Sequence, residues 1–560
     1  MNFFKKLTTI SLALATVVGC AITTHGAVVD KALTGAKSDI SLIAADFEVS
    51  GTKLNPESEL PSAYSSKDLG YTLPIRNQIY NTCWAYGSSS TLESVMLKDG
   101  YDVEHFAPMH MNHWGTKRED GSGWNRSFTS GGYAYISLGY FTSWQGPRLE
   151  KDYVETTLIS DFEWYNETAK KQVAVNGVVY LEDGDDETIK TAVYENGAVV
   201  ANYHVDERNY NPDTHAYYCN TIGLQTYQLN GHCISIVGWD DNFPKEYFEE
   251  TAQPSSDGAW LCKNSWGKNW GDHGYYWISY EDEYLFSDKF GPSYTFTDYE
   301  PYDNSKMIYQ NEVDGATYEF ECSSSFDTIT YINVFDTDKD YTVIDKINFE
   351  STAQGSPYII YRVPMAPTGL PTARESKWIE IGSGTVPYKG YLSVDTEDFL
   401  VNEEKFAIGV KLTKTENSTN SIGVCEWLST SGGGYIFLPQ SKHGQSYIAY
   451  GGSYIMDVMD LYKDSLEDDI GGTFVIKAIG EKELYQGDID MDGKVTILDA
   501  TGIQRYLAFY DEFSDKQESL ADTDKDGLIS IMDATTIQMQ LAGIDSDFND
   551  PFDDNFEVLE

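Results

Sequence analysis

The chain contains 560 residues, of which 41% are hydrophobic and 14% aromatic, so its length and composition allow three or four domains with packed cores. The formal net charge is −49. Because binding to phosphates or anionic lipids requires a basic surface that releases counterions, this charge argues against nucleic acid and anionic membrane as partners. Solubility and the binding of cations are the expected consequences.

Residues 1–27 show the layout of a signal peptide. Two lysines precede an apolar run from Leu7 to Val18, which is too short and too terminal to be a spanning helix. We therefore expect an exported protein without a transmembrane segment. The stretch Val17-Val18-Gly19-Cys20 resembles a lipoprotein processing box, in which Cys20 would be lipidated. Ordinary cleavage near Ala21 or Ala27 is the alternative.

Residues 28–58 are rich in Ala, Ser and Asp and show weak periodicity. This composition predicts a leader or a short propeptide before the first folded domain. A disordered spacer is the alternative.

The stretch from Gln78 to Gly87 predicts a loop that leads into a helix. Thr82 suits the N-cap position, and small or apolar residues recur until Gly100, which suits the left-handed C-terminal cap. Cys83 would be the first helical residue, where the helix dipole favours a thiolate and the backbone N–H has no intrahelical partner. This position therefore offers a nucleophile and a donor for an oxyanion. The alternative is a small buried hydrophobe, the usual role of a lone cysteine.

Two later stretches predict buried strands that carry polar residues at their ends. His232 lies at the start of NGHCISIVGWD, and Asn264 lies at the end of the strand in GAWLCKNSWG. Of the nine histidines, His232 alone opens an apolar strand with a matching Asn. His110 and His113 have the spacing of a ligand pair but lack an acidic ligand set, so no metal site is expected there. The order Cys, His, Asn is that of papain-like enzymes.

The region around Cys83, together with GHCISIVGWDD and KNSWGKNWGDHGYYWIS, resembles the papain family of cysteine peptidases over residues 59–300. The resemblance is greatest to bacterial members that carry a lectin-like domain after the catalytic one. It implies an α+β fold with a two-lobed catalytic domain: a helical half up to about Asp152, and a sheet-rich half that begins near Ile189. The implied substrate is a protein or peptide, and no cofactor is needed for catalysis.

The family's roles can be carried over to individual residues. Cys83 would be the nucleophile, His232 the general acid and base, Asn264 the residue that orients the imidazole, and Gln78 the side-chain donor of the oxyanion hole. Trp266 resembles the indole that shields the His–Asn hydrogen bond. Gly131 and Gly132 resemble the strand whose backbone pairs with the bound peptide, and together with Trp266 they form the expected substrate-binding set. A plain turn is the alternative for the two glycines.

The sequence departs from the family pattern near the nucleophile. Gln78 lies five residues before Cys83, where the family has six, and the following residue is Ile79 in place of Gly. Tyr80 stands where the family has a half-cystine, so a family disulfide is missing and packing must replace it. Strand alternation places Cys233 and Cys262 on opposite faces, so we do not expect them to pair.

Residues 301–479 contain short alternating apolar runs between clusters of Gly, Ser, Thr and Asp. Examples are the runs at 328–334, 358–361 and 406–410. This pattern predicts a β-sandwich accessory domain. Its place after the peptidase resembles the lectin-like domain, which implies a carbohydrate as a partner. Aromatic residues exposed on the sandwich would stack on sugars, although aromatics in a sandwich are more often core.

Residues 485–547 contain a repeat: GDIDMDGKVTILDATGIQRYLA is matched 34 residues later by ADTDKDGLISIMDATTIQMQLA. Carboxylates at alternate positions can converge on a hard cation, and Gly493 and Gly527 permit the turn between them. We therefore expect two Ca²⁺ ions. The expected ligands are Asp488, Asp490, Asp492, Thr496, Asp499 and the carbonyl of Lys494, then Asp522, Asp524, Asp526, Ser530, Asp533 and the carbonyl of Leu528.

An Asp closes each loop and no helix is evident before it, and these features resemble a dockerin, which attaches enzymes to the cohesin domain of a scaffold protein. The segment would thus be a small α-helical calcium-binding domain, followed by an acidic tail at 548–560. The residues expected to contact cohesin are Ile497, Leu498, Ile503 and Arg505 in the first copy and Ile531, Met532, Ile537 and Met539 in the second.

The sequence therefore predicts a secreted cysteine endopeptidase attached through cohesin to a cell-surface or free multi-enzyme complex of the cellulosome type, which takes part in polysaccharide breakdown. One alternative is an amidase that cleaves peptidoglycan stems. Another is an adhesion or substrate-recruiting protein with weak or no activity, for which the irregular loop at Gln78 would be a reason. The intact set of Cys83, His232 and Asn264 favours the peptidase.

Overall fold

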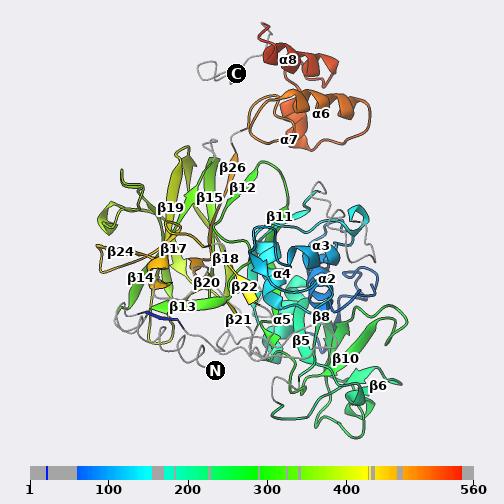
Figure 1. Cartoon of the computed structure of the whole chain (residues 1–560). Helices are drawn as coiled ribbons and strands as arrows, with labels where there is room; N and C mark the ends of the chain where they lie inside the picture. Colours follow the sequence, from blue (N-terminus) through cyan, green and yellow to red (C-terminus); the bar gives the residue numbers. More distant parts are fainter. Residues whose placement is uncertain are drawn as a thin grey trace.

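The computed structural model describes residues 20–22 and 60–544, with gaps at 154–169, 182–184, 225–228, 288–289, 323–325, 338–341, 427, 430–435, 440, 463–470 and 483. Most of the expected signal peptide, the leader at 28–58 and the acidic tail lie outside the described residues. Figure 1 shows a helical and sheet-containing body, a β-sandwich beside it, and a helical segment that projects from the sandwich at the C-terminal end. In the described part of the chain, no helix has the length and apolar character needed to cross a bilayer.

The helical half of the first body is built around α2 (Cys83–Lys98). The helix begins at Cys83 and is followed by Gly100 with φ +88°, as the sequence predicts. Thr82 does not cap the helix with its side chain; its hydroxyl donates instead to the carbonyl of Ile79. Thr82 therefore occupies the predicted N-cap position without a capping hydrogen bond from its side chain. The accompanying elements are β3 (Gly123–Trp124), α3 (Pro108–Trp114), α4 (Ala134–Thr142) and η1 (Glu150–Asp152).

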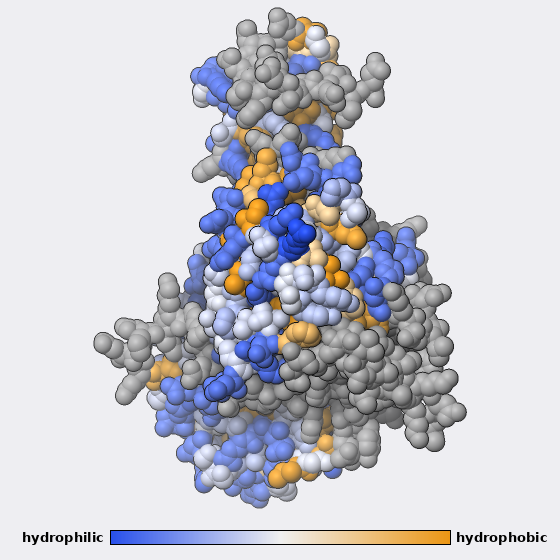
Figure 2. Space-filling view, turned by 90° about the vertical axis from the view of Figure 1, so that its left-hand side faces the viewer, coloured by the Kyte–Doolittle hydropathy of each residue, from blue (hydrophilic) through white to orange (hydrophobic). Residues whose placement is uncertain are grey.

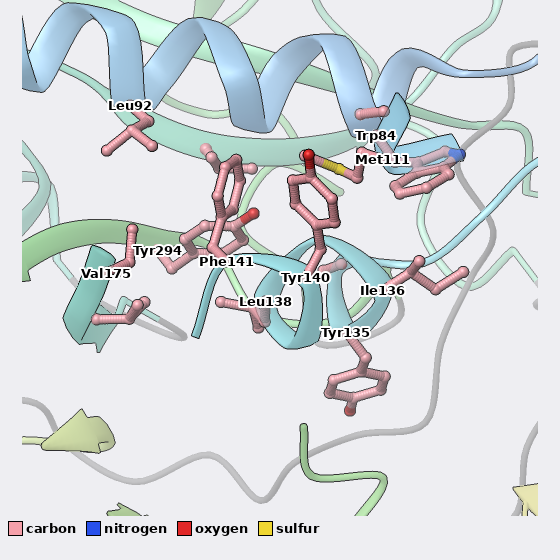
Figure 3. Close-up of a cluster of buried hydrophobic side chains, with 14 of the residues drawn as sticks. Trp84, Leu92, Met111, Tyr135, Ile136, Leu138, Tyr140, Phe141, Val175 and Tyr294 are labelled. Atoms are coloured by element: carbon pink, nitrogen blue, oxygen red, sulfur yellow. The ribbon is translucent and has the colours of Figure 1, made fainter. Parts of the chain in front are cut away.

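The central helix is buried along most of its length because neighbours cover it on several sides. Figure 3 shows Tyr140 and Phe141 of α4 directed toward it, with Val175 and Tyr294 nearby. On the side of the sheet, a Cβ atom at Gly87 would lie 2.8 Å from the sulfur of Cys233. The absence of a side chain at Gly87 thus lets α2 approach the sheet closely.

The sheet-rich half contains the two predicted strands, of which one carries His232 and the other ends just before Asn264. Within it, β8 pairs with β5, β9 and β2, and His232 lies opposite Tyr203. Cys233 packs toward α2, whereas Cys262 lies in a separate cluster on the other side of the sheet, as strand alternation predicts. The elements are β2 (Ala63–Ser65), β4 (Val173–Tyr180), α5 (Asp186–Asn196), β5 (Val199–His204), η3 (Glu207–Asn209), β6 (Tyr210–Asn211), β7 (Ala216–Tyr217), β8 (Gly231–Asp240), η5 (Lys245–Tyr247), β9 (Ala259–Lys263), β10 (Tyr275–Ser279) and β11 (Tyr294–Pro301).

The following region is a β-sandwich, as predicted. One layer is a six-stranded sheet in the order β17-β16-β19-β14-β23-β24, and its inner face packs on strands of the other layer through a large apolar core. The elements are β12 (Lys306–Tyr309), β13 (Tyr318–Cys322), β14 (Thr328–Asp336), β15 (Thr342–Ser351), β16 (Pro357–Val363), η7 (Glu375–Lys377), β17 (Ile379–Thr385), β18 (Gly390–Val401), β19 (Lys405–Thr413), β20 (Ile422–Glu426), β21 (Leu428–Ser429), β22 (Ile436–Leu438), β23 (Ser446–Tyr450), β24 (Tyr454–Asp457), η8 (Val458–Tyr462), β25 (Gly472–Phe474) and β26 (Ile476–Lys482). The short strand β1 (Cys20–Ile22) pairs with β13.

The first body and the sandwich share one continuous sheet. Strand β18 pairs with β4 at Gly390 and Tyr391, so the order runs β12-β26-β15-β18-β4-β11-β5-β8 and onward into the first body. A second junction joins β22 to β3, where the rings of Phe437 and Trp124 lie 5.0 Å apart. The two parts are therefore fused through backbone hydrogen bonds and a common apolar core.

The C-terminal segment folds into α6 (Ile497–Leu507), α7 (Asp515–Ala521) and α8 (Ile531–Leu541) around a small core of its own. The helix α7 directly precedes the second acidic loop, so the expectation that no helix precedes the loops was wrong for that copy. Ile503 and Ile537 are fully buried in this core. This placement corrects the expectation that they contact cohesin, because a side chain needed to hold the helices together is not on the surface.

Candidate active site

The nucleophile candidate and the imidazole lie on elements that pack against each other. Cys83 begins α2, His232 lies near the start of β8, and both are fully buried in the chain alone. Burial and then the charge of the nearby Cys83 thiolate raise the pKa of the Cys233 thiol well above its usual value. Cys83 is thus near enough to the residue after His232 to influence its ionisation.

Asn264 holds one nitrogen of the His232 ring. The Nε2 atom lies 2.8 Å from Oδ1 of Asn264, which also accepts the backbone N–H of Ser265 at 2.7 Å. Trp266 stacks on the imidazole with ring centroids 4.4 Å apart. The other nitrogen, Nδ1, is buried without a hydrogen-bond partner in the described structure. This arrangement leaves Nδ1 for exchange of a proton with a thiol.

The buried position determines the charge of the resting imidazole. Burial lowers the pKa of His232 to about 4, although the hydrogen bond with Asn264 acts in the opposite direction. The neutral ring is therefore favoured at neutral pH whenever no negative charge lies beside it. A thiolate at Cys83 would supply that charge and stabilise the imidazolium, so the two groups should titrate as a pair.

Gln78 lies on a segment that runs beside the residues after Asn264. Its backbone N–H donates to the carbonyl of Ser265 at 2.6 Å, and its Oε1 accepts the hydroxyl of Ser265 at 2.7 Å. Its Nε2 donates to the carbonyl of Tyr80 at 3.1 Å, within the turn that ends at Cys83. Tyr80 has φ +57°, so the shortened loop contains a left-handed residue that is not Gly. The carboxamide nitrogen is thus bonded within the turn that leads into α2.

The glycine pair is held by an arginine that the sequence analysis did not single out. Arg126 is 6% exposed, and its Nε donates to the carbonyl of Gly131 at 2.9 Å. The guanidinium lies 5.2 Å from the ring of Trp84, the residue after the nucleophile. A Cβ atom at Gly132 would lie 2.4 Å from that indole, so only Gly fits. The remaining bonds of Arg126 go to Ser130 O at 2.6 Å, Asn112 Oδ1 at 2.7 Å, and Asn112 O and Gly115 O at 3.2 Å.

A buried carboxylate beneath the site also escaped the sequence analysis. Glu93 of α2 is fully buried and contacts Arg76, whose Nη2 lies 3.0 Å from its Oε1. Burial would raise the pKa of Glu93, but Arg76, His105 and Lys263 together hold it below its usual value. Burial lowers the pKa of Lys263 to about 8, although the negative charge of Glu93 acts to raise it. No periodic pattern distinguishes one acidic residue in a helix, so the sequence alone carried no signal for this role.

The carboxylates of the repeat converge in both loops. Oxygens of Asp488, Asp490 and Asp492 lie within 4.8 Å of one another, as do oxygens of Asp522, Asp524 and Asp533. Burial and then the neighbouring carboxylates raise the pKa of Asp488 to about 7. A divalent cation bound between these carboxylates would neutralise their mutual repulsion. Asp499 and Asp526 lie outside these two clusters. Asp499 accepts the backbone N–H of Ile489 at 2.7 Å.

The hydroxyl side chains expected to bind calcium and the residues expected to contact cohesin lie around the same loops. Thr496 and Ser530 cap α6 and α8 through Leu498 N and Met532 N, at 3.1 and 3.0 Å. The exposed fractions of Ile497, Leu498, Ile531 and Met532 lie between 54% and 64%. Arg505 is exposed and pairs with Asp511, and Met539 is half-buried. The first turns of the two helices therefore present matching apolar surfaces.

Comparison with known proteins agrees with this geometry. The family model described as papain family cysteine protease matches residues 60–289. The crystal structure of the cysteine protease and lectin-like domains of Cwp84, a surface layer associated protein of Clostridium difficile, is 31% identical, with a TM-score of 0.67 over 78% of this chain and 91% of that one. The chain belongs to the papain family of cysteine proteases. Cysteine proteinase 3 of Entamoeba histolytica is 24% identical over 238 residues, which cover 42% of this chain and 68% of that protein.

Two further family models cover the rest of the folded chain. The lectin-like domain matches residues 308–479, and the dockerin type I domain matches residues 486–542. A second structure of Cwp84, obtained after propeptide cleavage, is also 31% identical and is covered completely, with a TM-score of 0.66. The chain is thus a cysteine peptidase that carries a lectin-like domain and a dockerin. Dockerins of this type bind calcium, and both acidic clusters fall within the matched segment.

Proposed function

We propose that the chain is a secreted endopeptidase in which Cys83 and His232 hydrolyse peptide bonds. The observation that carries the proposal is the His232–Asn264 hydrogen bond under Trp266, because it fixes the ring with Nδ1 buried and unpaired. We propose domain limits of 59–300, 301–479 and 485–547, after a signal peptide at 1–27 and a leader at 28–58.

The first half of the reaction forms an acyl-enzyme. His232 Nδ1 accepts the proton of the Cys83 thiol, and the thiolate attacks the carbonyl carbon of the peptide. The backbone N–H of Cys83 and Nε2 of Gln78 donate to the oxyanion that develops, and Gly131 and Gly132 hold the peptide backbone. The imidazolium then gives its proton to the leaving amine as the C–N bond breaks, which leaves a thioester on Cys83.

The second half releases the acid. His232 takes a proton from a water molecule, whose oxygen attacks the thioester carbonyl. The tetrahedral intermediate collapses with loss of the Cys83 thiolate, which recovers its proton from the imidazolium. Asn264 holds the ring in one orientation throughout, and Trp266 keeps water from the hydrogen bond that does so.

A peptide library tests the peptidase directly. Purified wild type should cleave internal bonds of L-peptides, and Cys83→Ala and His232→Ala should be inactive. Cys425→Ala, a cysteine of the sandwich, serves as the control and should retain activity. Equal cleavage by wild type and Cys83→Ala would reject the proposal, and cleavage restricted to stem peptides with D-residues would favour an amidase.

We further propose that calcium organises the dockerin and that its exposed first turns bind a cohesin domain. Asp488 and Asp522 would each open one calcium loop, and the matching apolar surfaces at Ile497 and Ile531 would contact the partner. The enzyme would thereby join a multi-enzyme complex outside the cell, whose other members degrade polysaccharides.

Binding of the full chain to a panel of cohesins tests the attachment. Binding should require calcium and should be lost with a chelator and in the double variant Asp488→Ala/Asp522→Ala. Glu512→Ala, an exposed acidic residue outside the loops, is the matched control and should bind normally. Binding that ignores both calcium and the double substitution would reject this part of the proposal.

A further inference from the structure

The outer face of the six-stranded sheet carries a pocket that no role described so far uses. Ile329 and Tyr331 of β14 point into the sandwich core, so the alternating Thr328 and Thr330 point outward. At this end of the sheet the chain encloses a pocket of about 230 Å³. Its lining includes Thr328, Thr330, Glu375, Trp378, Lys411 and Tyr454. Figure 2 views this side of the molecule and shows residues of intermediate hydropathy beside strongly hydrophilic ones.

Aromatic rings border the pocket and are held in place by contacts outside it. Tyr450 and Tyr454 lie on either side of the β23–β24 turn, with ring centroids 4.6 Å apart, and Tyr454 is 48% exposed. Trp378 donates from Nε1 to the carbonyl of Thr372 at 2.8 Å, which fixes the indole. Its ring also packs edge-on against Tyr361 at 5.5 Å. The pocket therefore has apolar ring faces whose orientation is set before any ligand arrives.

A charged pair lies within the same pocket. Lys411 Nζ is 2.6 Å from Oε1 of Glu375, and both side chains keep part of their surface exposed, at 21% and 29%. The backbone N–H of Glu375 donates to Gly452, in the turn between the two tyrosines, at 3.4 Å. An ammonium donor and a carboxylate acceptor side by side match adjacent hydroxyl groups, which both donate and accept.

We propose that this pocket binds one ring of a neutral saccharide. Its volume lies below the roughly 300–1,000 Å³ of pockets for drug-sized ligands, which suits a single sugar ring. The aromatic faces would stack on the apolar C–H face of the ring, and the Lys411–Glu375 pair and the threonine hydroxyls would bond its hydroxyls. The net charge of −49 disfavours an acidic polysaccharide. The inference assigns a site and a class of sugar to the carbohydrate partner expected for the lectin-like domain, and it does not depend on the peptidase function.

Affinity electrophoresis of the full chain tests the proposal, with Cys83→Ala as background to prevent self-digestion. The probes are mixed-linkage glucan, glucomannan and arabinoxylan in separate gels. At least one should retard the protein, and Trp378→Ala and Lys411→Met should each weaken that retardation by about tenfold or more, as expected for a central aromatic or charged contact. Tyr247→Ala, an exposed tyrosine of the peptidase body, is the control and should migrate as the background does.

Three results would overturn the proposal. The first is normal migration of the protein on all three polysaccharides, the second is retardation of both pocket variants as strong as that of the background protein, and the third is a loss of retardation in Tyr247→Ala as large as in the pocket variants. Thermal melting of each variant shows whether the sandwich is intact, and Glu375→Gln provides a second pocket variant if Trp378→Ala fails to fold. With Cys83 restored, Trp378→Ala should cleave peptides at the wild-type rate. Failure of saccharide binding therefore leaves the peptidase result unaffected.

Discussion

Arg76 and Glu93 join the loop before the nucleophile to the middle of the nucleophile helix, with Nη2 and Oε1 3.0 Å apart. Arg76 directly precedes the segment that bridges to Trp266, and Lys263, which also acts on Glu93, directly precedes Asn264. One buried carboxylate of α2 thus interacts with charged residues next to the Gln78 segment and next to Asn264.

Removal of the Glu93 charge should destabilise the fold. Glu93→Gln leaves Lys263 buried without its counter-charge. It leaves Arg76 with the more distant Glu150, whose Oε2 lies 3.8 Å from Nη1. Breaking a buried ion pair costs about 3–5 kcal/mol. Chemical unfolding at neutral pH measures the loss. Glu104→Gln, which breaks a surface pair with Lys151, is the control and should cost less than about 1 kcal/mol.

The same variant should change the pH dependence of stability. Because the folded pKa of Glu93 lies below its ordinary value of 4.5, its stabilisation is complete above that pH and is lost as pH falls through the folded pKa. Glu93→Gln should lack this acid-side loss. An unaltered slope between neutral and acid pH would contradict the assignment.

Trp266 should control the pKa of His232. In a Cys83→Ala background the ring titrates without a thiol beside it, and its pKa should lie well below the usual 6.5 because burial lowers it to about 4. Adding Trp266→Ala admits water and should raise this pKa toward 6.5. Titration of the His232 ring resonances by NMR measures the shift. The control is Trp270→Ala, which removes a ring that packs edge-on against Trp266 and should change the pKa of His232 less.

Gln78 should matter mainly in the transition state. Gln78→Ala should lower kcat by about 10²-fold or more with little change in KM, the usual effect of losing one oxyanion donor. Ser265→Ala removes the hydroxyl that holds the carboxamide oxygen and should have a smaller effect of the same kind. Steady-state kinetics on one fluorogenic peptide compares the two, and a near-wild-type Gln78→Ala would assign the oxyanion to another donor.

Arg126 should act as a positioning residue for the peptide backbone. Arg126→Lys loses the guanidinium hydrogen bonds to the carbonyls of Gly131 and Ser130. The segment that contains Gly131 and Gly132 should therefore move relative to Trp84. We expect kcat/KM to fall by about tenfold or more on peptides that extend along Gly131–Gly132, but less on a substrate with a single residue before the cleaved bond. A loss that is equal for both substrates would indicate a general defect in folding.

The peptidase body should not fold without the sandwich. A chain that ends at residue 300 loses the β18–β4 pairing and exposes Trp124, which packs on Phe437 of the sandwich. It also loses Asp314, whose Oδ1 accepts a hydrogen bond from Nη1 of Arg118 at 2.8 Å. It should be insoluble or lack a cooperative melting transition. A chain that ends at Lys482 keeps both junctions and should melt within a few degrees of the full chain. A soluble, active shorter chain would contradict this prediction.

The sequence predicted those features that depend on local pattern. The helix at Cys83, the strands of His232 and Asn264 and the sandwich strands follow apolar periodicity, and the calcium loops follow a spacing that only a few ligands satisfy. The roles of Arg126 and Glu93 were missed because each depends on partners from several loops. The error at Ile503 and Ile537 has a related cause: matching positions in two copies show that they are equivalent, but not whether they face solvent or each other.

The joint between β26 and the dockerin is short and is bonded on both sides. Lys482 Nζ donates to the carbonyl of Asp492 at 2.6 Å, and Asn304 Nδ2 donates to that of Asp490 at 3.2 Å, so the first calcium loop rests on the end of the sandwich. An enzyme on a long flexible linker can take many orientations and can contact any protein within the length of the linker. If the dockerin attaches the chain to a scaffold as proposed, a catalytic body mounted this way would keep one orientation relative to its point of attachment, and its position along the scaffold would decide which neighbouring polypeptides reach Cys83.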